Sequence, residues 1–252
     1  MFTIGADPEL FFRNNYKLVS VIDKLGGSKD MPLPLDVAGC AIQEDNVAAE
    51  YNIPPCKNVQ EFIHYNLHVL NDLSERAAKL GLMLAPGIAS HSFDDEELQH
   101  WKAGVFGCDP DYNAWTMEKN PPPYSPDPNL RSAGGHVHIG SDLDPWHLGR
   151  AADIFLGVPA TLRDGDERRR SLYGKAGAVR IKPYGVEYRT LSNFWIWSEK
   201  DMHWVYEQTA KVIDFVENNQ TIPEEMQYLC EQAINFGNKD ACARVLEFTN
   251  GY

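Results

Sequence analysis

The sequence lacks the features that would place it in several common classes. It has no apolar run near the roughly 20 residues that a membrane-spanning helix needs, and its first residues do not resemble a signal peptide. Its five cysteines are odd in number, scattered and free of any CxxC pair, which argues against a disulfide framework or a thiolate zinc site. We therefore expect a cytoplasmic protein with no membrane partner.

Positive charge is also scarce. The formal net charge of −13 argues against a general nucleic-acid binder, because neutralising phosphates requires an excess of Lys and Arg. The GxxxxGK[ST] phosphate loop and the protein-kinase signatures are missing as well. An acidic chain without these motifs fits a protein that holds cations.

What is present suffices for one large domain. The chain has 252 residues, of which 43% are hydrophobic, and we expect a single domain over 1–252 whose final part, about 199–252, is helical. Capping boxes and apolar periodicity predict helices over 58–80, 144–156, 199–218, 223–236 and 240–248. Period-2 patterns predict strands over 2–12, 16–22, 42–53, 82–88 and 134–140. The proline-containing stretch 89–131 is predicted to be irregular and to face the substrate.

The most informative strand runs from Gly134 to Gly140 and contains His136 and His138. Residues two apart on a strand point to the same face, so both imidazoles can enter one site while the intervening apolar residues enter the core. The flanking glycines leave room for a ligand or a second backbone. Two solvated histidines on a polar strand face are the alternative.

Two further strands carry acids in the same alternating pattern. Asp7 and Glu9 share a face of the first strand, where a cation between them would relieve their repulsion. Pro8 cannot donate to a ladder, so this strand should lie at an edge or a bulge. In 42–53, treated as one strand, Glu44 and Glu50 fall on its polar face. An exposed acidic face is the alternative for each strand.

The segment from Arg163 to Phe194 concentrates basic residues in an otherwise acidic chain. Arginine forks match phosphate oxygens, and glycines at 174 and 177 let backbone N–H groups approach an anion. We interpret Arg168–Arg170 as a solvated basic loop, and we assign a functional role to Arg180, Glu187 and Arg189. Acids, imidazoles and arginines together favour Mg²⁺ or Mn²⁺ with a nucleoside triphosphate.

These motifs, in this order, resemble the glutamine synthetase / glutamate–cysteine ligase superfamily. Two sequence motifs are most similar to its phage-encoded carboxylate–amine ligase (amidoligase) branch: Gly-Ala-Asp-Pro-Glu-Leu-Phe and Tyr-Gly-Lys-Ala-Gly-Ala-Val-Arg. The resemblance covers about residues 2–197. It implies an α+β fold in which a curved, mostly antiparallel sheet has helices on its convex face. It also implies a cytoplasmic, ATP-dependent ligase (in the host cytoplasm if the protein is phage-encoded), with small-molecule or peptide carboxylate and amine substrates.

The resemblance also implies roles for individual residues, without identifying the substrates. The implied metal ligands are Asp7, Glu9, Glu50, His136 and Glu187, although either histidine could fill that role, and Glu44 is a less certain ligand. The implied nucleotide contacts are His138, Lys175, Arg180 and Lys182, and the implied catalytic residues are Arg189, Arg180 and Glu50. Aspartate replaces the family's usual glutamate at position 7, so Asp7 would bind metal through water or only support the ligands.

The implied reaction has two steps. A substrate carboxylate attacks the γ-phosphorus of ATP to give an acyl phosphate, and an amine then displaces phosphate to form an amide. Three alternatives stay open: a metal-dependent hydrolase, a phosphotransferase similar to guanidino kinases, and a non-catalytic metal-binding protein.

Overall fold

A computed structural model describes residues 2–104 and 110–251. The predicted α+β class is confirmed, because the strands of every sheet pair antiparallel and helices pack beside them. The largest sheet has the strand order β1-β12-β14-β13-β10. Its strands are β1 (Thr3–Ala6), β12 (Val137–Gly140), β14 (Gly185–Tyr188), β13 (Ala178–Lys182) and β10 (Tyr112–Asn113).

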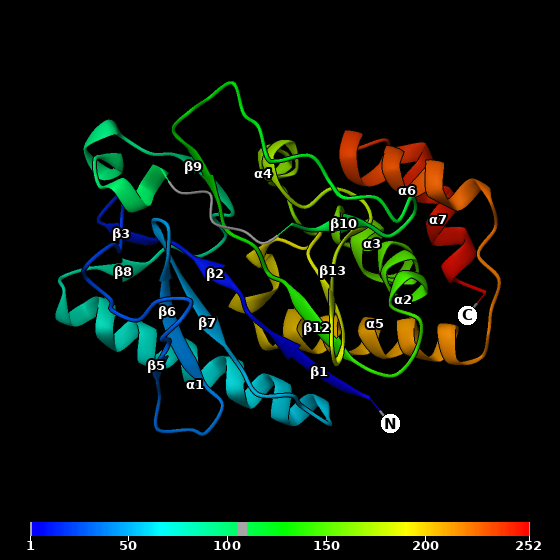
Figure 1. The fold of residues 1–252 in the computed structure, drawn as a ribbon, viewed down its shortest axis with the longest axis horizontal. Helices are drawn as coiled ribbons and strands as arrows, with labels where there is room; N and C mark the ends of the chain where they lie inside the picture. The colour runs from blue at the N-terminus through cyan, green and yellow to red at the C-terminus, as the bar shows by residue number, and fades with distance from the viewer. Residues whose placement is uncertain (1, 105–109, 252) are drawn as a thin grey trace.

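Three smaller sheets complete the strands (Figure 1). The four-stranded sheet contains β2 (Glu9–Leu10), β7 (Ala48–Asn52), β6 (Ala41–Asp45) and β5 (Leu33–Pro34). The three-stranded sheet contains β4 (Lys17–Val19), β3 (Phe12–Asn14) and β8 (Met83–Leu84). The pair β11 (Leu130–Ser132) and β9 (Ser90–Ser92) forms the last.

The chain passes directly from the five-stranded sheet to the four-stranded sheet between β1 and β2. At this junction Asp7 N–H donates to the His136 carbonyl (3.4 Å), and Tyr51 N–H donates to the Pro8 carbonyl (3.1 Å). The expectation that Pro8 interrupts its strand is confirmed, since β1 ends at Ala6 and β2 begins at Glu9. Asp7 and Glu9 therefore lie where the polar faces of the two sheets adjoin.

The prediction of one strand over 42–53 is wrong. This segment forms the hairpin β6–β7, whose turn contains Asn46 with a positive φ of 53°. Asparagine tolerates this left-handed conformation better than most residues, so the chain reverses without glycine or proline. The register pairs Gln43 with Glu50, and a pair directly opposite in a ladder shares one face of the sheet.

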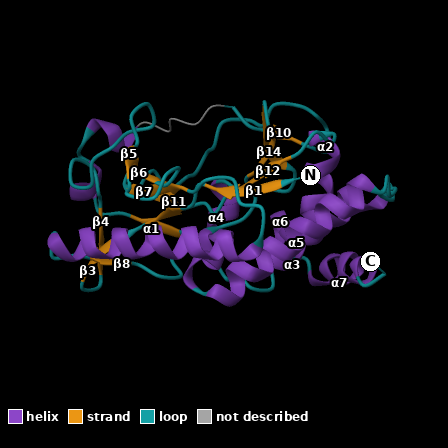
Figure 2. Ribbon diagram, turned by 90° about the horizontal axis from the view of Figure 1, so that it is seen from below, coloured by secondary structure: helices purple, strands orange, loops and turns teal. Residues whose placement is uncertain are grey.

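Helices lie along one side of the two larger sheets (Figure 2). Helix α1 (Val59–Lys79) begins at the predicted capping box, where Asn58 accepts from Glu61 N–H (2.9 Å). Phe62 of α1 stacks on Trp195 with ring centroids 5.5 Å apart. The inward-facing residues of β12 and β14, such as Ile139 and Val186, are fully buried in the same core.

The remaining helices follow the prediction closely. Helix α2 (Pro145–Ala152) starts behind the Asp144 cap and continues through a π-helical turn, Asp153–Gly157, into α3 (Val158–Ala160). The C-terminal part contains α5 (Glu199–Glu217), α6 (Glu225–Phe236) and α7 (Lys239–Thr249), with α6 and α7 beside each other at one end of the molecule (Figure 1). None of the described helices combines the length and apolar character that a bilayer crossing requires.

Two segments, 82–88 and 89–131, differ in part from the prediction. The strand expected over 82–88 is limited to β8 (Met83–Leu84). The stretch 89–131 is largely irregular but contributes β9, β10, β11 and two short 3₁₀ helices, Asp95–Leu98 and Trp101–Gly104. Residues 105–109 lie outside the described part. One short helix, α4 (Glu167–Leu172), lies within the basic segment 163–194.

Candidate active site

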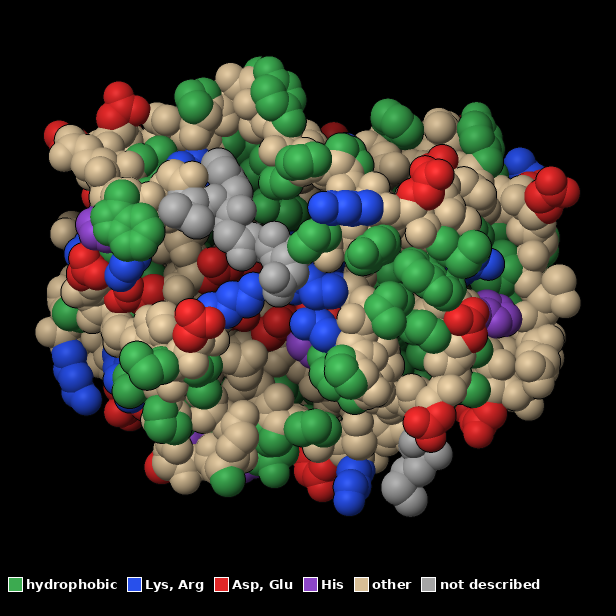
Figure 3. All heavy atoms as spheres, viewed as in Figure 1, with side chains coloured by type: hydrophobic (Ala, Val, Ile, Leu, Met, Phe, Trp, Pro, Cys, Tyr) green, Lys and Arg blue, Asp and Glu red, His purple; other side chains and the backbone are tan. Residues whose placement is uncertain are grey.

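A hollow of about 430 Å³ lies where the polar faces of the two larger sheets adjoin. We call it the acidic hollow; it is lined by Asp7, Glu9, Lys29, Pro32, Ala41, Gln43, Asp45, Glu50, Asn52, His136, His138, Arg180, Lys182 and Arg189. Carboxylates lie deep in a depression of this face, with basic side chains beside them (Figure 3). Asp7, Glu9, Glu50 and His136 of the predicted metal ligands line this space. Glu187 is fully buried at its wall, and Glu44 does not line it.

The sheet register explains why residues far apart in sequence meet here. Across the five-stranded sheet, His138 pairs with Glu187, and Glu187 pairs with Arg180. Directly paired residues point to the same face, so one row of the sheet presents an imidazole, a carboxylate and a guanidinium side by side. In the four-stranded sheet, Glu9 pairs with Glu50 in the same way.

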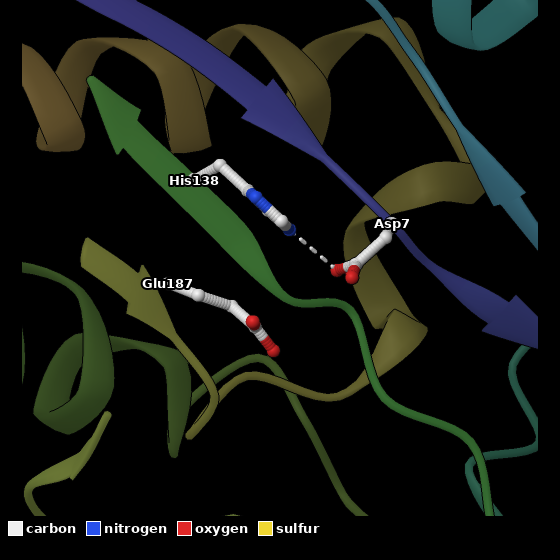
Figure 4. Close-up of side chains that lie close together, drawn as sticks. All are labelled: Asp7, His138 and Glu187. Atoms are coloured by element: carbon white, nitrogen blue, oxygen red, sulfur yellow. Dashed lines mark ion pairs between the residues drawn. The ribbon is translucent and has the colours of Figure 1, made fainter. Parts of the chain in front are cut away.

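The first ligand cluster consists of Asp7, His138 and Glu187. One possible ligand atom from each lies within 4.8 Å of the others, and the three side chains point toward one another (Figure 4). His138 Nε2 and Asp7 Oδ1 lie 2.9 Å apart. Although burial opposes each shift, their opposite charges lower the pKa of Asp7 and raise the pKa of His138.

His136 faces the same carboxylates. Its Nδ1 lies 3.4 Å from Asp7 Oδ1 and 3.9 Å from Glu187 Oε1. Burial and the nearby charge of Arg189 lower the pKa of His136 to about 4, so its imidazole is neutral and able to bind metal near pH 7. A Cβ at Gly134 would lie 2.2 Å from His136 Nε2, so this glycine makes room for the imidazole of His136 itself.

Glu187 is surrounded by cations. Its carboxylate lies 3.1 Å from Arg180 Nη1 and 3.0 Å from Lys182 Nζ, and it also pairs with Arg189. Burial and Asp7 oppose ionisation, but Arg189, His136 and Arg180 lower the pKa of Glu187 to about 2. Glu187 is therefore ionised at physiological pH and shares its negative charge among three cationic partners.

The second ligand cluster consists of Glu9, Asp45 and Glu50, whose ligand atoms also lie within 4.8 Å of one another. Burial, followed by the charge of Asp45, raises the pKa of Glu9 to about 7. Burial also raises the pKa of Asp45 and of Glu50, and other carboxylates add to both shifts. Three partly buried acids with raised pKa values are held together against their repulsion, which a divalent cation would relieve.

Asp45 was missed at the sequence level, and Glu44 was placed in its role. Because the 42–53 segment is a hairpin, odd positions of β6 share a face with even positions of β7, so Asp45 joins Glu50. Glu44 faces away from the acidic hollow and accepts backbone N–H groups of Asp23, Lys24 and Gly26. The expectation that Glu44 belongs to the acidic site is therefore wrong, and the turn-forming Asn46 was the available signal.

Arg169 was also misjudged. The prediction of a solvated loop over Arg168–Arg170 is wrong for Arg169 and Arg170, whose exposed fractions are 1% and 8%. Arg169 donates to the carbonyls of Thr190 (2.8 Å) and Arg189 (3.3 Å), at the end of the strand that carries Glu187. Gly174, with φ of 80°, permits this packing, since a Cβ there would lie 2.0 Å from Arg169 Nη1.

The residues present fit divalent metal ions. Asp7 Oδ1 and His138 Nε2 are buried, and neither forms a well-aligned hydrogen bond with a described residue. The second cluster offers only oxygen donors, and the first offers oxygen and imidazole. Mg²⁺ and Mn²⁺ prefer such ligands, and the softer Mn²⁺ accepts the imidazole readily.

A second pocket of about 230 Å³, which we call the apolar pocket, adjoins the hollow at His138 and Asn52. It is lined by Thr3, Gly5, Ala6, Asn52, Ile53, Pro55, His138, Gly140 and Tyr184. The Tyr184 ring stacks near His138, with centroids 5.9 Å apart, and its hydroxyl contacts His138 Nδ1. Lys175, predicted to contact nucleotide, lines neither space.

Comparison with protein families supports the reading from sequence. Residues 128–247 match the family described as "Phage phiEco32-like COOH.NH2 ligase-type 2". The matched part includes β12, β13 and β14, and thus both histidines, Glu187 and Arg189, whereas Asp7, Glu9 and Glu50 precede it. The match confirms the resemblance to the carboxylate–amine ligase branch.

Comparison with solved structures gives a distant match. A structure described as "Crystal structure of novel glutamine synthase homolog" aligns with a TM-score of 0.43 and 12% sequence identity. The alignment covers 97% of this chain and 63% of that chain, so the present chain spans less than two thirds of the homolog's length. Comparison with the curated proteins finds no match.

Proposed function

We propose that the protein is an ATP-dependent carboxylate–amine ligase that forms an amide through an acyl-phosphate intermediate, as the family match of residues 128–247 leads us to expect. The observation that carries the proposal is the acidic hollow itself. Two ligand clusters lie beside the basic residues Arg180, Lys182 and Arg189, so the hollow can hold both cations and a polyphosphate.

The two clusters would hold divalent ions, one at Asp7, His138 and Glu187 and one at Glu9, Asp45 and Glu50. Bound Mg²⁺ or Mn²⁺ would neutralise phosphate charge and polarise the γ-phosphoryl group. The protein's contribution is to place these ligands on strands that are fixed by register and by a buried core, and Asp7 at the junction between β1 and β2.

The basic residues lie on β13 and directly after the end of β14. Arg180 and Lys182 lie two apart on β13, and Arg189 follows the end of β14. Their spacing suits successive phosphate groups, and the apolar pocket at Tyr184 gives an aromatic, weakly polar space for the nucleotide base. ATP would then extend from Tyr184 toward Arg189, with its γ-phosphoryl group nearest Arg189.

The chemistry requires charge neutralisation and alignment. The substrate carboxylate attacks the γ-phosphorus, the bond to ADP breaks, and Arg180, Lys182 and Arg189 would stabilise the charge that moves onto the leaving oxygen. The amine then attacks the carbonyl carbon, the C–N bond forms, the C–O bond to phosphate breaks, and the amine's proton passes to the departing phosphate. A hydrolase on the same ligands would leave the row of basic residues without a role, which is why we favour the ligase.

Trapping the intermediate tests this proposal. The protein is incubated with ATP, Mg²⁺, hydroxylamine and a panel of amino acids, dicarboxylic acids and short peptides, because hydroxylamine converts an acyl phosphate into a stable hydroxamate. We expect hydroxamate and ADP in equal amounts with at least one acid, and neither product with Glu187→Ala. ADP accompanied by a phosphorylated amine would indicate a phosphotransferase, and ATP-independent bond cleavage would indicate a hydrolase.

A further inference from the structure

A third pocket lies at the opposite end of β13 from the apolar pocket. Its volume is about 260 Å³, and its walls include Asp111, prolines 121–123, Tyr124, Tyr173, Lys175 and Ala178. We call it the proline pocket. The family resemblance implies a nucleotide contact for one of its lining residues, Lys175, but neither the resemblance nor the reaction outlined above gives the pocket itself a ligand.

Alternate residues of β13 and of the turn after it line the proline pocket, the acidic hollow and the apolar pocket in succession. Ala178 lines the proline pocket, Arg180 and Lys182 line the acidic hollow, and Tyr184 lines the apolar pocket. Within β13, residues two apart point the same way and advance by about 6.6 Å, so the proline pocket and the hollow follow one another along one face. Tyr184, in the turn after β13, brings the apolar pocket next to the hollow. If ATP occupies the apolar pocket and the hollow, the proline pocket lies beyond its γ-phosphate end.

The hollow and the proline pocket share a wall. Arg189, which lines the hollow, has its Nε 3.5 Å from Oδ2 of Asp111, which lines the proline pocket. Backbone contact reinforces this proximity, since Arg189 N–H donates to the Ala178 carbonyl (2.9 Å). A group held by Asp111 is thus one side chain away from the residue that faces the transferred phosphate.

The walls of the proline pocket define the chemistry of its ligand. Asp111 supplies a carboxylate whose side chain is 19% exposed, and Asn120 orients it by donating to Oδ1 (3.0 Å). Lys175, an exposed ammonium, lines the same pocket, and prolines and two tyrosines supply the rest of the lining named above. One acid and one base in a small, partly apolar space complement a zwitterion with an apolar or aromatic side chain.

We infer that the proline pocket binds the amine substrate, and that this substrate is a free amino acid whose ammonium group contacts Asp111 and whose carboxylate contacts Lys175. The inference rests on the proposed ligase function for its place in the reaction. The pocket's binding of an amino acid can nevertheless be measured without any turnover.

A binding experiment tests the inference directly. Saturation-transfer NMR is recorded on the protein with Mg²⁺, a non-hydrolysable ATP analogue and a mixture of the 20 common L-amino acids. We expect at least one amino acid to bind, with an affinity at least tenfold lower for its carboxamide, which lacks the carboxylate. Absence of binding by every amino acid, or equal affinity for the carboxamide, would overturn the inference.

Variants assign the binding to this pocket. Asp111→Asn keeps an oxygen for Asn120 and should weaken binding at least tenfold. Tyr124→Ala, at a residue that is 80% exposed, should weaken it several-fold without affecting folding. Glu118→Gln is the matched control, because Glu118 is an exposed acid of the same segment outside the pocket lining. Binding that is the same in wild type, Asp111→Asn and Tyr124→Ala would place the amino acid elsewhere.

A kinetic ratio separates this inference from the proposed function. With an acid that yields hydroxamate, Asp111→Asn should lower the ratio of amide to hydroxamate at least tenfold, since hydroxylamine is too small to need the pocket. A parallel loss of both products would show that Asp111 acts only through Arg189. If no acid yields hydroxamate, the proposed function fails, while the NMR result still decides whether the pocket binds an amino acid.

Discussion

The substitution Asp45→Asn should change the stability of the protein in opposite directions with and without metal. Ligand atoms of Glu9, Asp45 and Glu50 lie within 4.8 Å of one another. Two unit negative charges at that distance repel by about 3 kcal/mol at an effective dielectric constant near 20. Raised pKa values let protons relieve part of this repulsion, so we expect removal of one charge near pH 8 to stabilise the metal-free protein by about 1–2 kcal/mol.

This stabilisation corresponds to a rise in Tm of about 2–8 °C for a chain of this size. With Mn²⁺ at about one hundred times the wild-type Kd, the wild type should gain about 2.7 kcal/mol. The variant lacks one ligand, so its Kd should be at least tenfold higher and its gain about half as large.

Differential scanning calorimetry with EDTA and with Mn²⁺ measures both effects, and Asp142→Asn, at an exposed surface acid, serves as the control. A lower Tm of Asp45→Asn in EDTA would refute the claim that the cluster is strained by repulsion. An equal metal-induced shift in wild type and variant would refute the claim that Asp45 is a ligand.

Three further predictions follow from the contacts of the hollow. Glu187→Gln leaves three cations without their common partner, so it should lower the unfolding free energy measured in urea by about 3–5 kcal/mol, with partial recovery in pyrophosphate. It should also lower ligase activity by roughly 10²–10⁴-fold. Unchanged activity would remove Glu187 from the metal site. Because the pKa of Glu9 is raised to about 7, the folded protein binds the Glu9 proton more tightly than the unfolded chain does. The unfolding free energy of the metal-free protein should therefore fall by up to about 3 kcal/mol as pH rises from about 4.5 to 7. Mn²⁺ affinity measured by titration calorimetry should increase over the same interval, and a flat profile would contradict the assignment. Arg169→Met should lower the unfolding free energy by about 3 kcal/mol, because two buried carbonyls lose their donor, and an unchanged urea midpoint would show that the buried guanidinium is dispensable.

The sequence was sufficient to locate most of the hollow because alternation on a strand fixes which side chains share a face. His136 and His138 were found in this way, as were the carboxylate of Glu187 and the guanidinium of Arg189. The long helix α1 was found from its Asn58 cap. These signals are local, because within each element the apolar residues indicate the buried face and the polar residues indicate the opposite face.

The residues that were missed depend on contacts between distant segments. A turn at Asn46 without glycine or proline reverses the phase of the alternation, and this moved Asp45 into the hollow and Glu44 out of it. The burial of Arg169 depends on the carbonyls of Arg189 and Thr190 and on space left by Gly174, none of which a run of three arginines indicates. Asp111 lies in an irregular segment, where no periodicity reports its neighbours.

Both ligand clusters of the hollow should bind divalent ions beside a nucleotide. The most direct measurement is a crystal structure grown with Mn²⁺ and a non-hydrolysable ATP analogue, with anomalous data collected near the manganese edge. We expect one anomalous peak among Asp7, His138 and Glu187, a second among Glu9, Asp45 and Glu50, and phosphate density along Arg180 and Lys182. Manganese bound only outside the hollow, or a nucleotide bound away from these residues, would contradict the account.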